Sequence, residues 1–495
     1  MSMIKAENLT FAYPSSYDLI FENVNFQIDT NWRLGFVGRN GRGKTTLFKL
    51  LLGEYEYLGK ISHSVTFDYF PYPISDSTQM TADILMDISP QAEEWELLRE
   101  FTQLEVDPEV LWRPFQTLSN GEQTKVLLAA RFLNEGHFLL IDEPTNHLDT
   151  TARQAVAAYL KKKTGFILVS HDRYFLDECV DHILALNRTT IQVQSGNFST
   201  WLENFERQQD SEVAQNERLK KDIARLRQSA LRSAHWSDAV EKSKNGTRSS
   251  GSKIDKGYVG HKAAKMMKRS KSIAARQQQA IVQKSALLKD RETAAQLTIH
   301  PLVYHTDLLV SFSNISILYD GIPICEPISF EIHQGDRILI AGKNGSGKSS
   351  LLKLVSHIPI EHRGTVTIGS GLVISYVPQN TSHLRGSLSE FARQSKIDES
   401  LFKTILYKMA FERTQFEKNM QDYSEGQKKK VLIAKSLCEK AHLYVWDEPL
   451  NFIDIYSRMQ IEQLIAECSP TMLLAEHDAA FQQNTATKIV TCCRC

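Results

Sequence analysis

The sequence contains two glycine-rich runs, each ending in a lysine followed by hydroxyl residues. They read GRNGRGKTT at residues 38–46 and GKNGSGKSS at residues 342–350. Glycines let a loop turn its backbone N–H groups towards phosphate oxygens, while the lysine reaches the β- and γ-phosphates and the next hydroxyl ligates Mg²⁺. The residues predicted to bind ATP in these loops are Gly38, Asn40, Gly41, Gly43, Lys44, Thr45, Thr46, Gly342, Asn344, Gly345, Gly347, Lys348, Ser349 and Ser350.

Three further motifs follow each loop at matching intervals. A serine comes 75 residues after Lys44 and 76 residues after Lys348, and an Asp-Glu-Pro glutamate lies 24 residues beyond each serine. A histidine then follows after 28 residues in the first half and 29 in the second. Four motifs in one order predict two copies of one domain. The serine motifs supply Ser119, Gly121, Ser424 and Gly426 as further ATP contacts.

The acidic motifs are suited to metal binding and to activating water. An aspartate that follows a buried strand can hold the water shell of a metal, and the glutamate after it can orient or deprotonate an attacking water. We predict γ-phosphate contacts for the histidines, although a lone histidine is more often structural. The predicted catalytic residues are Glu143, Glu448, His171 and His477, and the predicted metal-site residues are Thr45, Asp142, Ser349, Gln379 and Asp447.

Tyr13 and Tyr319 precede their glycine loops by 25 and 23 residues. An aromatic ring at this point can stack on a purine, so both are predicted to contact ATP. A place in the hydrophobic core is the alternative for each of them.

The segments around these motifs predict the elements that position them. The apolar runs 34–37, 138–141, 338–341 and 443–446 have the composition of buried strands. Residues 46–52 and 350–355 are expected to form helices, the first ending near Gly53. Strands that alternate with helices favour an α/β domain with a largely parallel sheet.

The region between the two copies differs in charge and in pattern. The chain has 58 Lys and Arg against 58 Asp and Glu, but residues 211–300 have 20 against 8. Apolar residues recur at helical spacing from Leu219 to Ala230 and every seven residues from Met266 to Leu287. We therefore predict a basic antiparallel helical hairpin with a tip loop near 240–261, which contacts a polyanion. A disordered tether is the alternative.

Composition excludes several classes of protein. The 495 residues are 42% hydrophobic and 23% charged, so the chain is neither disordered nor collagen-like. Because it has no run of 18 apolar residues and no signal peptide, a membrane span and secretion are not expected. The seven cysteines, an odd number in a large chain, indicate a reducing compartment. The last four residues, CCRC, are expected to be a frayed tail with free thiols.

The set of glycine loop, serine signature, Asp-Glu-Pro and histidine resembles the ATP-binding cassette proteins. Two cassettes in one chain, joined by a basic hairpin, resemble the ABC-F family, and within it the Lsa and Vga type of antibiotic-resistance proteins. The resemblance implies an α/β fold of two P-loop cassettes at 1–206 and 301–495, joined by a helical hairpin linker at 207–300. It also implies a cytoplasmic monomer whose cassettes close on two ATP molecules with Mg²⁺. Each site would pair one cassette's loop with the other's signature.

The resemblance further implies ribosome protection against lincosamide, pleuromutilin or streptogramin A antibiotics. The hairpin tip would enter at the exit-site tRNA and reach 23S rRNA near the peptidyl-transferase centre. The alternatives are a housekeeping translation factor of the same family, the ATPase subunit of a transporter, and a DNA-repair ATPase, for which zinc-type cysteine pairs are missing. The residues predicted to contact rRNA are Trp236, Lys242, Lys244, Arg248, Lys253, Lys256 and Tyr258.

The two copies differ beside the predicted metal, where Gln379 of the second has Tyr72 as its counterpart. A glutamine can sense Mg²⁺ or the attacking water, which a tyrosine at this place does not do. We therefore predict that Glu448→Gln alone lowers ATP turnover more than Glu143→Gln alone. Steady-state phosphate release from the two single variants checks this, and equal losses would contradict a kinetic role for Tyr72.

Overall fold

The structure is a computed structural model that describes residues 2–14, 19–146, 148–187, 190–243 and 297–493, with five single positions between 268 and 279. Contacts divide the chain into two units, Met1–Trp201 with Ala294–Cys495 and Leu202–Thr293. The first unit contains both cassettes, and the second contains the linker.

The first cassette has two sheets. A three-stranded antiparallel sheet has the order β2-β1-β4, and a six-stranded sheet has the order β5-β6-β7-β3-β8-β9, parallel except for β9. The strands are β1 (Met3–Phe11), β2 (Phe21–Asp29), β3 (Arg33–Gly38), β4 (Leu58–Ser62), β5 (Thr66–Phe70), β6 (His137–Asp142), β7 (Phe166–Val169), β8 (His182–Leu186) and β9 (Ile191–Ser195). The helices are α1 (Lys44–Leu51), α2 (Thr81–Ile88), α3 (Glu94–Leu104), α4 (Asn120–Arg131), α5 (Thr150–Leu160) and α6 (Arg173–Cys179), with 3₁₀ turns at Pro108–Trp112 and Phe115–Thr117.

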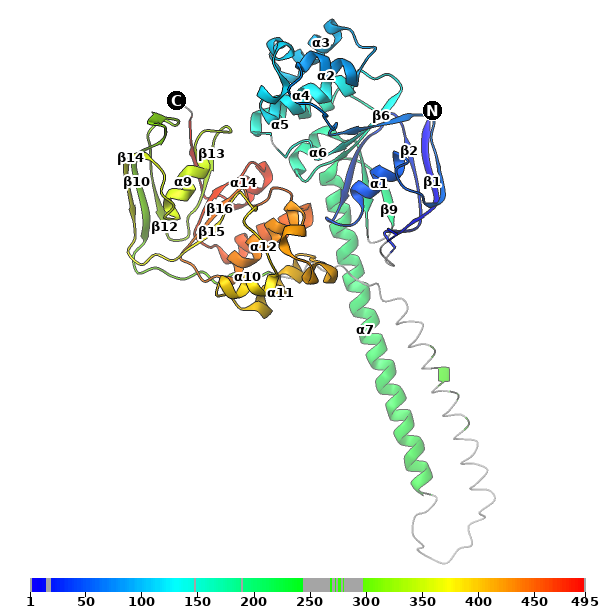
Figure 1. The fold of residues 1–495 in the computed structure, drawn as a ribbon. Helices are drawn as coiled ribbons and strands as arrows, with labels where there is room; N and C mark the ends of the chain where they lie inside the picture. Colours follow the sequence, from blue (N-terminus) through cyan, green and yellow to red (C-terminus); the bar gives the residue numbers. More distant parts are fainter. Residues whose placement is uncertain are drawn as a thin grey trace, which may run out of the picture. The chain divides into compact units, whose positions relative to one another are not determined.

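The second cassette repeats this plan. A five-stranded parallel sheet has the order β15-β16-β17-β13-β18, and a smaller antiparallel sheet is built on β10. Helix α9 contacts strands of both sheets (Figure 1). The strands are β10 (Leu308–Tyr319), β11 (Ile322–Pro323), β12 (Ile328–His333), β13 (Arg337–Ala341), β14 (His362–Ile368), β15 (Ile374–Val377), β16 (Leu443–Asp447), β17 (Met472–Ala475) and β18 (Lys488–Thr491). The helices are α9 (Lys348–Val355), α10 (Leu388–Gln394), α11 (Glu399–Lys408), α12 (Glu425–Cys438), α13 (Ile455–Cys468) and α14 (Ala479–Thr485), with 3₁₀ turns at Arg413–Glu417 and Met420–Asp422.

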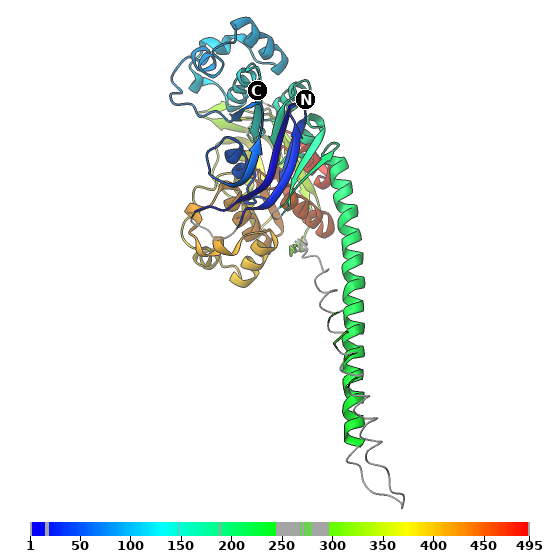
Figure 2. The ribbon, with the colours of Figure 1, turned by 90° about the vertical axis from the view of Figure 1, so that its right-hand side faces the viewer.

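The first half of the linker is one long helix, α7 (Phe198–Ser243), whose 46 residues form an unbroken rod (Figures 1 and 2). Its first turn is anchored by Phe198 and Trp201, which are both buried. Along the predicted apolar stripe, Ile223 is buried and Leu219 and Leu226 are half-buried. The stripe is therefore the sheltered face of α7. Lys220, Lys221 and Arg225 lie between its members and are exposed.

The elements predicted around the motifs are confirmed. The four apolar runs lie within β3, β6, β13 and β16, and the two helices begin at the loop lysines. Gly53 follows α1 with a φ of 75°, the left-handed conformation expected of a helix stop.

The linker prediction is confirmed only in its first half. Helix α7 begins at Phe198 and extends through Ser243, so the predicted tip loop cannot begin at 240. Lys268, Ser272, Ala275, Arg276 and Gln279 have helical backbone and are exposed. The rest of the tip loop and of the second helix lies outside the described residues.

The prediction of a frayed C-terminus is wrong for Cys492, which is buried one residue after β18. Its N–H donates to Ala341 O at 2.7 Å, and its thiol donates to Ser346 O at 2.8 Å. The edge strand thus extends to pack against the second glycine loop, and this long-range pairing has no local signal in CCRC.

Candidate functional site

Each glycine loop connects a central parallel strand to a helix that begins at the loop lysine. Gly43 and Gly347 precede these helices with φ values of 99° and 94°, which favour glycine. A Cβ at Gly43 would come within 2.5 Å of the Ile20 side chain, so the loop also leaves no room for a larger residue.

The loop lysines are buried and are held by backbone oxygens. Lys44 Nζ donates to Gly38 O at 2.8 Å and to Asn40 Oδ1 at 3.2 Å. Lys348 Nζ donates to Gly342 O at 2.9 Å and to Lys343 O at 3.0 Å. Burial lowers the pKa of both lysines. A buried ammonium that meets only neutral oxygens is suited to receive an anionic phosphate.

Each loop hydroxyl contacts the aspartate predicted to help hold a metal. Thr45 Oγ1 donates to Asp142 Oδ2 at 3.0 Å, and Ser349 Oγ donates to Asp447 Oδ1 at 2.9 Å. The other oxygen of Asp447, Oδ2, is buried and has no hydrogen-bond partner within the described chain. Burial raises the pKa of Asp447 to about 6. A hydroxyl beside a free carboxylate oxygen fits the hard oxygen ligands that Mg²⁺ prefers.

In the first cassette the predicted catalytic glutamate lies next to the predicted histidine. His171 Nε2 is 3.2 Å from Glu143 Oε1. This oxygen nevertheless has no hydrogen-bond partner among the described residues. Burial, followed by the charge of Asp142, raises the pKa of Glu143 to about 8. Burial lowers the pKa of His171 well below its usual value.

In the second cassette the glutamate has more contacts. Gln379 Nε2 and Asn451 Nδ2 each donate to Glu448 Oε2 at 2.7 Å. His477 Nε2 lies 3.7 Å from Glu448 Oε1, and burial lowers the pKa of this histidine to about 4. Gln379, predicted as a metal-site residue, is therefore hydrogen-bonded to the carboxylate predicted to be catalytic.

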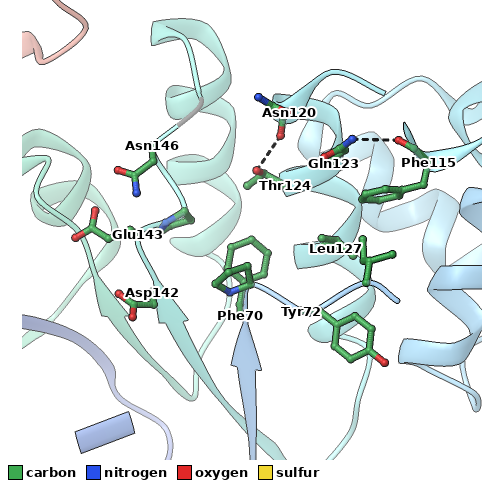
Figure 3. Close-up of a pocket in the computed structure, with 13 residues that line it drawn as sticks. Phe70, Tyr72, Phe115, Asn120, Gln123, Thr124, Leu127, Asp142, Glu143 and Asn146 are labelled. Carbon is green, nitrogen blue, oxygen red and sulfur yellow. Dashed lines mark hydrogen bonds between the residues drawn. The ribbon is translucent and has the colours of Figure 1, made fainter. Parts of the chain in front are cut away.

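Tyr72, the counterpart of Gln379, does not reach its own glutamate. The guanidinium carbon of Arg131 lies 4.6 Å from the centroid of the Tyr72 ring. The Tyr72 side chain points away from Asp142 and Glu143 (Figure 3). Tyr69 contacts the aspartate instead, because its hydroxyl donates to Asp142 Oδ2 at 3.2 Å. The sequence comparison identified the substitution at Tyr72 but missed the contact of Tyr69.

The two tyrosines predicted to stack on a purine are each held by a hydrogen bond to a hydroxyl of their own glycine loop. The hydroxyl of Tyr13 lies 2.8 Å from Thr46 Oγ1, and that of Tyr319 lies 2.9 Å from Ser350 Oγ. Tyr13 also packs edge-on against Phe11. Tyr319 is 52% exposed, so its ring is accessible while its hydroxyl is held.

The signature serines cap the helices that follow them. Ser119 accepts a hydrogen bond from Glu122 N at the start of α4, and Ser424 accepts one from Gln427 N at the start of α12. In both motifs the third residue after the serine returns the bond, which completes a capping box. The spacing S-x-x-E/Q is the sequence signal for this cap, which the motif-based prediction overlooked.

One cavity brings the first signature and the second glycine loop together. It has a volume of 1290 Å³, and Ser119, Gly121, Lys348, Glu448 and His477 are among its lining residues. The first glycine loop likewise lies beside the second signature. Asn40 Nδ2 donates to Phe452 O at 2.8 Å, and a Cβ at Gly426 would lie 3.2 Å from Asn40 Nδ2. Loop and signature of opposite cassettes thus lie next to each other in both pairings.

Two ion pairs, one partly and one fully buried, involve the aspartates that follow the histidines, and the sequence prediction missed them. Arg153 Nη1 lies 2.9 Å from Asp172 Oδ2, and Arg458 Nη1 lies 2.7 Å from Asp478 Oδ2. Each arginine comes ten residues after its glutamate, and each aspartate directly follows its histidine. The repeat itself was the signal that could have identified these pairs.

The predicted rRNA contacts cannot be placed in the same way. Trp236 and Lys242 lie in the last part of α7, residues 230–243, of which only the backbone is described. The other five, Lys244, Arg248, Lys253, Lys256 and Tyr258, lie outside the described residues.

Comparison with known proteins identifies the family. The profile described as ABC transporter matches residues 21–146 and 325–451, just over half of the chain. The chain belongs to the ABC transporter family. Its two cassettes in one chain and its relatives are those of an ABC-F protein, and its cassettes bind and hydrolyse ATP. Among the described residues, no helix is both apolar enough and long enough to cross a membrane.

Similar proteins cover nearly the whole chain. Ribosome protection protein VmlR of Bacillus subtilis is 26% identical over 494 residues, which is 97% of this chain and 85% of that protein. ATP-binding protein Uup of Caulobacter vibrioides is 26% identical over 487 residues, which is 95% and 74%. The archaeal ribosome recycling factor aABCE1, crystallised with the ribosomal stalk protein aP1, has a TM-score of 0.65 at 19% identity, covering 98% and 87%. At that identity, the structural likeness shows the fold.

The accessible ring of Tyr319 gives a prediction for nucleotide binding. In a Lys44→Ala background, which leaves the second glycine loop to bind, Tyr319→Ala should weaken ATP binding about tenfold because a base–aromatic stack is lost. Tyr319→Phe should keep affinity within about twofold, since it keeps the ring. Titration with a fluorescent ATP analogue measures both. Tyr407→Ala, at an exposed tyrosine of α11, is the control, and a larger loss in Tyr319→Phe than in Tyr319→Ala would contradict stacking.

Proposed function

We propose that this chain is an ATP-driven ribosome-binding protein of the cytoplasm that protects the ribosome from antibiotics acting at the peptidyl-transferase centre. The observation that carries the proposal is the similarity to a ribosome protection protein over 97% of the chain. Because the similarity spans both cassettes and the segment between them, it includes the part proposed to touch the ribosome.

The linker supports a contact with RNA. Residues 211–300 have 20 basic side chains against 8 acidic ones, while the chain as a whole is neutral. On α7, Lys220, Lys221 and Arg225 are exposed beside the sheltered stripe. Basic side chains along a helix neutralise phosphates without reading a sequence, which suits an rRNA surface.

The cassettes would drive a cycle of closing and opening. Lys44 and Lys348 bind the phosphates of ATP, and the serines and glycines of the opposite signatures complete each site only when the cassettes close. Bound at Thr45 and Asp142, or at Ser349 and Asp447, Mg²⁺ would neutralise phosphate charge. Glu143 and Glu448 orient water and accept its proton, so hydrolysis reopens the pair.

A housekeeping role in translation is the second candidate. It is favoured by the equal identity, 26%, to ATP-binding protein Uup, whose name carries no protective function. The two candidates share the ATPase cycle and differ only in what the linker tip does. Drug susceptibility of cells therefore separates them, whereas ATPase assays do not.

The proposed cycle predicts that the closed form accumulates on ribosomes when hydrolysis stops. The double variant Glu143→Gln with Glu448→Gln keeps hydrogen bonding but removes both bases, so turnover should fall by about 10²-fold or more. Co-sedimentation with 70S ribosomes in ATP should retain this variant.

The control adds Lys44→Ala and Lys348→Ala, which should abolish retention because ATP no longer binds. Sedimentation with membranes instead of ribosomes would favour the transporter ATPase and overturn the proposal.

The proposed protective role predicts that a change in the linker tip affects antibiotic resistance without affecting ATPase activity. Replacement of residues 242–260 by a short Gly/Ser turn should leave basal ATPase nearly intact, because the nucleotide residues all lie in the cassettes. Ribosome binding should weaken only partly, since Lys220 and Arg225 remain on α7.

Resistance to lincosamides, pleuromutilins and streptogramin A should be lost at equal expression. Unchanged resistance would favour the housekeeping role. Loss of ATPase activity would show that the predicted domain limits are wrong.

A further inference from the structure

A buried lysine in the second cassette forms hydrogen bonds with the backbone beside the glutamate proposed to be catalytic. Lys429 is on α12 and is only 2% exposed. Its Nζ donates to Glu448 O at 3.0 Å, to Pro378 O at 3.1 Å and to Asp447 O at 3.4 Å. One side chain thus connects three elements of the cassette: the end of β16, the turn after β15, and α12.

The hydrogen-bond partners of Lys429 are neutral backbone oxygens. An ammonium has three donors, and here three carbonyl oxygens accept from them. Within the described chain, Lys429 has no carboxylate at ion-pair distance, although the charges of Asp447, Glu476 and Glu448 attract it from farther away. Burying an ammonium without an ion partner is unfavourable, so a neutral residue would serve packing better. Its position therefore points to a role in fixing the backbone.

The backbone that Lys429 fixes is the part that aims the glutamate. Glu448 has a φ of 45°, a left-handed conformation that is strained for a residue with a side chain. Its N–H donates to Ala475 O at 2.9 Å, and its C=O accepts from Lys429. Pro378 directly precedes Gln379, which donates to the Glu448 carboxylate. Lys429 therefore holds the backbone on both sides of the Gln379–Glu448 hydrogen bond.

The first cassette lacks this contact at the corresponding position. Thr124 comes five residues after Ser119, as Lys429 comes five after Ser424. Its hydroxyl donates instead to Asn120 O, one turn back on α4, at 2.9 Å (Figure 3). A cavity of 400 Å³ opens here, and Tyr72, Thr124 and Glu143 are among its lining residues.

We propose that Lys429 is a positioning residue that holds Glu448 and Gln379 in register for hydrolysis at the second nucleotide site. Among the described residues the first site has no equivalent, because Thr124 leaves the space beside Glu143 open. The proposal rests on the proposed role of Glu448 as the base. It assigns the difference between the sites to the signature helices as well as to the Gln379/Tyr72 exchange.

The test uses the full chain with one site silenced. In a Glu143→Gln background, where only the second site hydrolyses ATP, Lys429→Thr should lower kcat about tenfold and leave the KM for ATP within about twofold, because misaligned groups react slowly while binding persists. Lys428→Thr is the matched control. Lys428 is the neighbouring lysine, pairs with the exposed Glu425, and should not affect kcat.

Two further arms separate positioning from a general structural role. Lys429→Ala should regain activity several-fold in ethylammonium chloride but not in sodium chloride of equal ionic strength, because a small ammonium fits the vacated space. In a Glu448→Gln background, Thr124→Lys should raise the turnover of the first site several-fold, since the new side chain reaches the open cavity.

The outcomes are distinguishable. If Lys429→Thr lowers thermal stability or ATP affinity with kcat unchanged, or if ethylammonium gives no recovery, Lys429 is only structural and the proposal is overturned. If Lys429→Thr does not fold, an unchanged turnover of Thr124→Lys overturns it. If adding Glu448→Gln to the Glu143→Gln background leaves turnover intact, the role of Glu448 as the base fails independently of Lys429.

Discussion

Each candidate nucleotide site contains a glutamate that the fold holds in a left-handed backbone conformation. Glu143 and Glu448 have φ values of 52° and 45°, which a residue with a side chain adopts only when its surroundings enforce it. In both cassettes the N–H of this glutamate donates to the end of the neighbouring parallel strand, at Val169 O and Ala475 O. The central sheet thus sets the direction of the carboxylate, and the loops around it decide what the carboxylate meets.

The side chains that surround the carboxylates of Glu143 and Glu448 differ. Around Glu448, two amide groups donate to one oxygen and a buried ammonium holds the backbone. Around Glu143, burial is the largest influence and raises its pKa to about 8, and one of its oxygens has no donor among the residues that the structure describes. Equal scaffolds therefore carry unequal electrostatics, because the differences lie in side chains that do not contribute to the sheet.

The sequence predicted the features that repeat and are local, and missed those that depend on distant pairing. The glycine loops, the strands before them and the acidic motifs were predictable because each has a short pattern and occurs twice. The hydrogen bond from the Tyr69 hydroxyl to Asp142 and the burial of Cys492 against Ser346 join segments 73 and 146 residues apart, for which a single sequence carries no signal. The backbone contacts of Lys429 were not predicted, because it lies in a run of three lysines and such a run is ordinarily expected to face solvent.

Helix α7 has a mechanical consequence. Its 46 residues span about 69 Å at 1.5 Å per residue, and its first turn is fixed by the buried rings of Phe198 and Trp201. A long helix that is fixed at one end converts a small change of direction there into a larger displacement of its other end. A tilt of about 5° at the clamp would carry the far end sideways by about 6 Å, more than the rise of one helical turn.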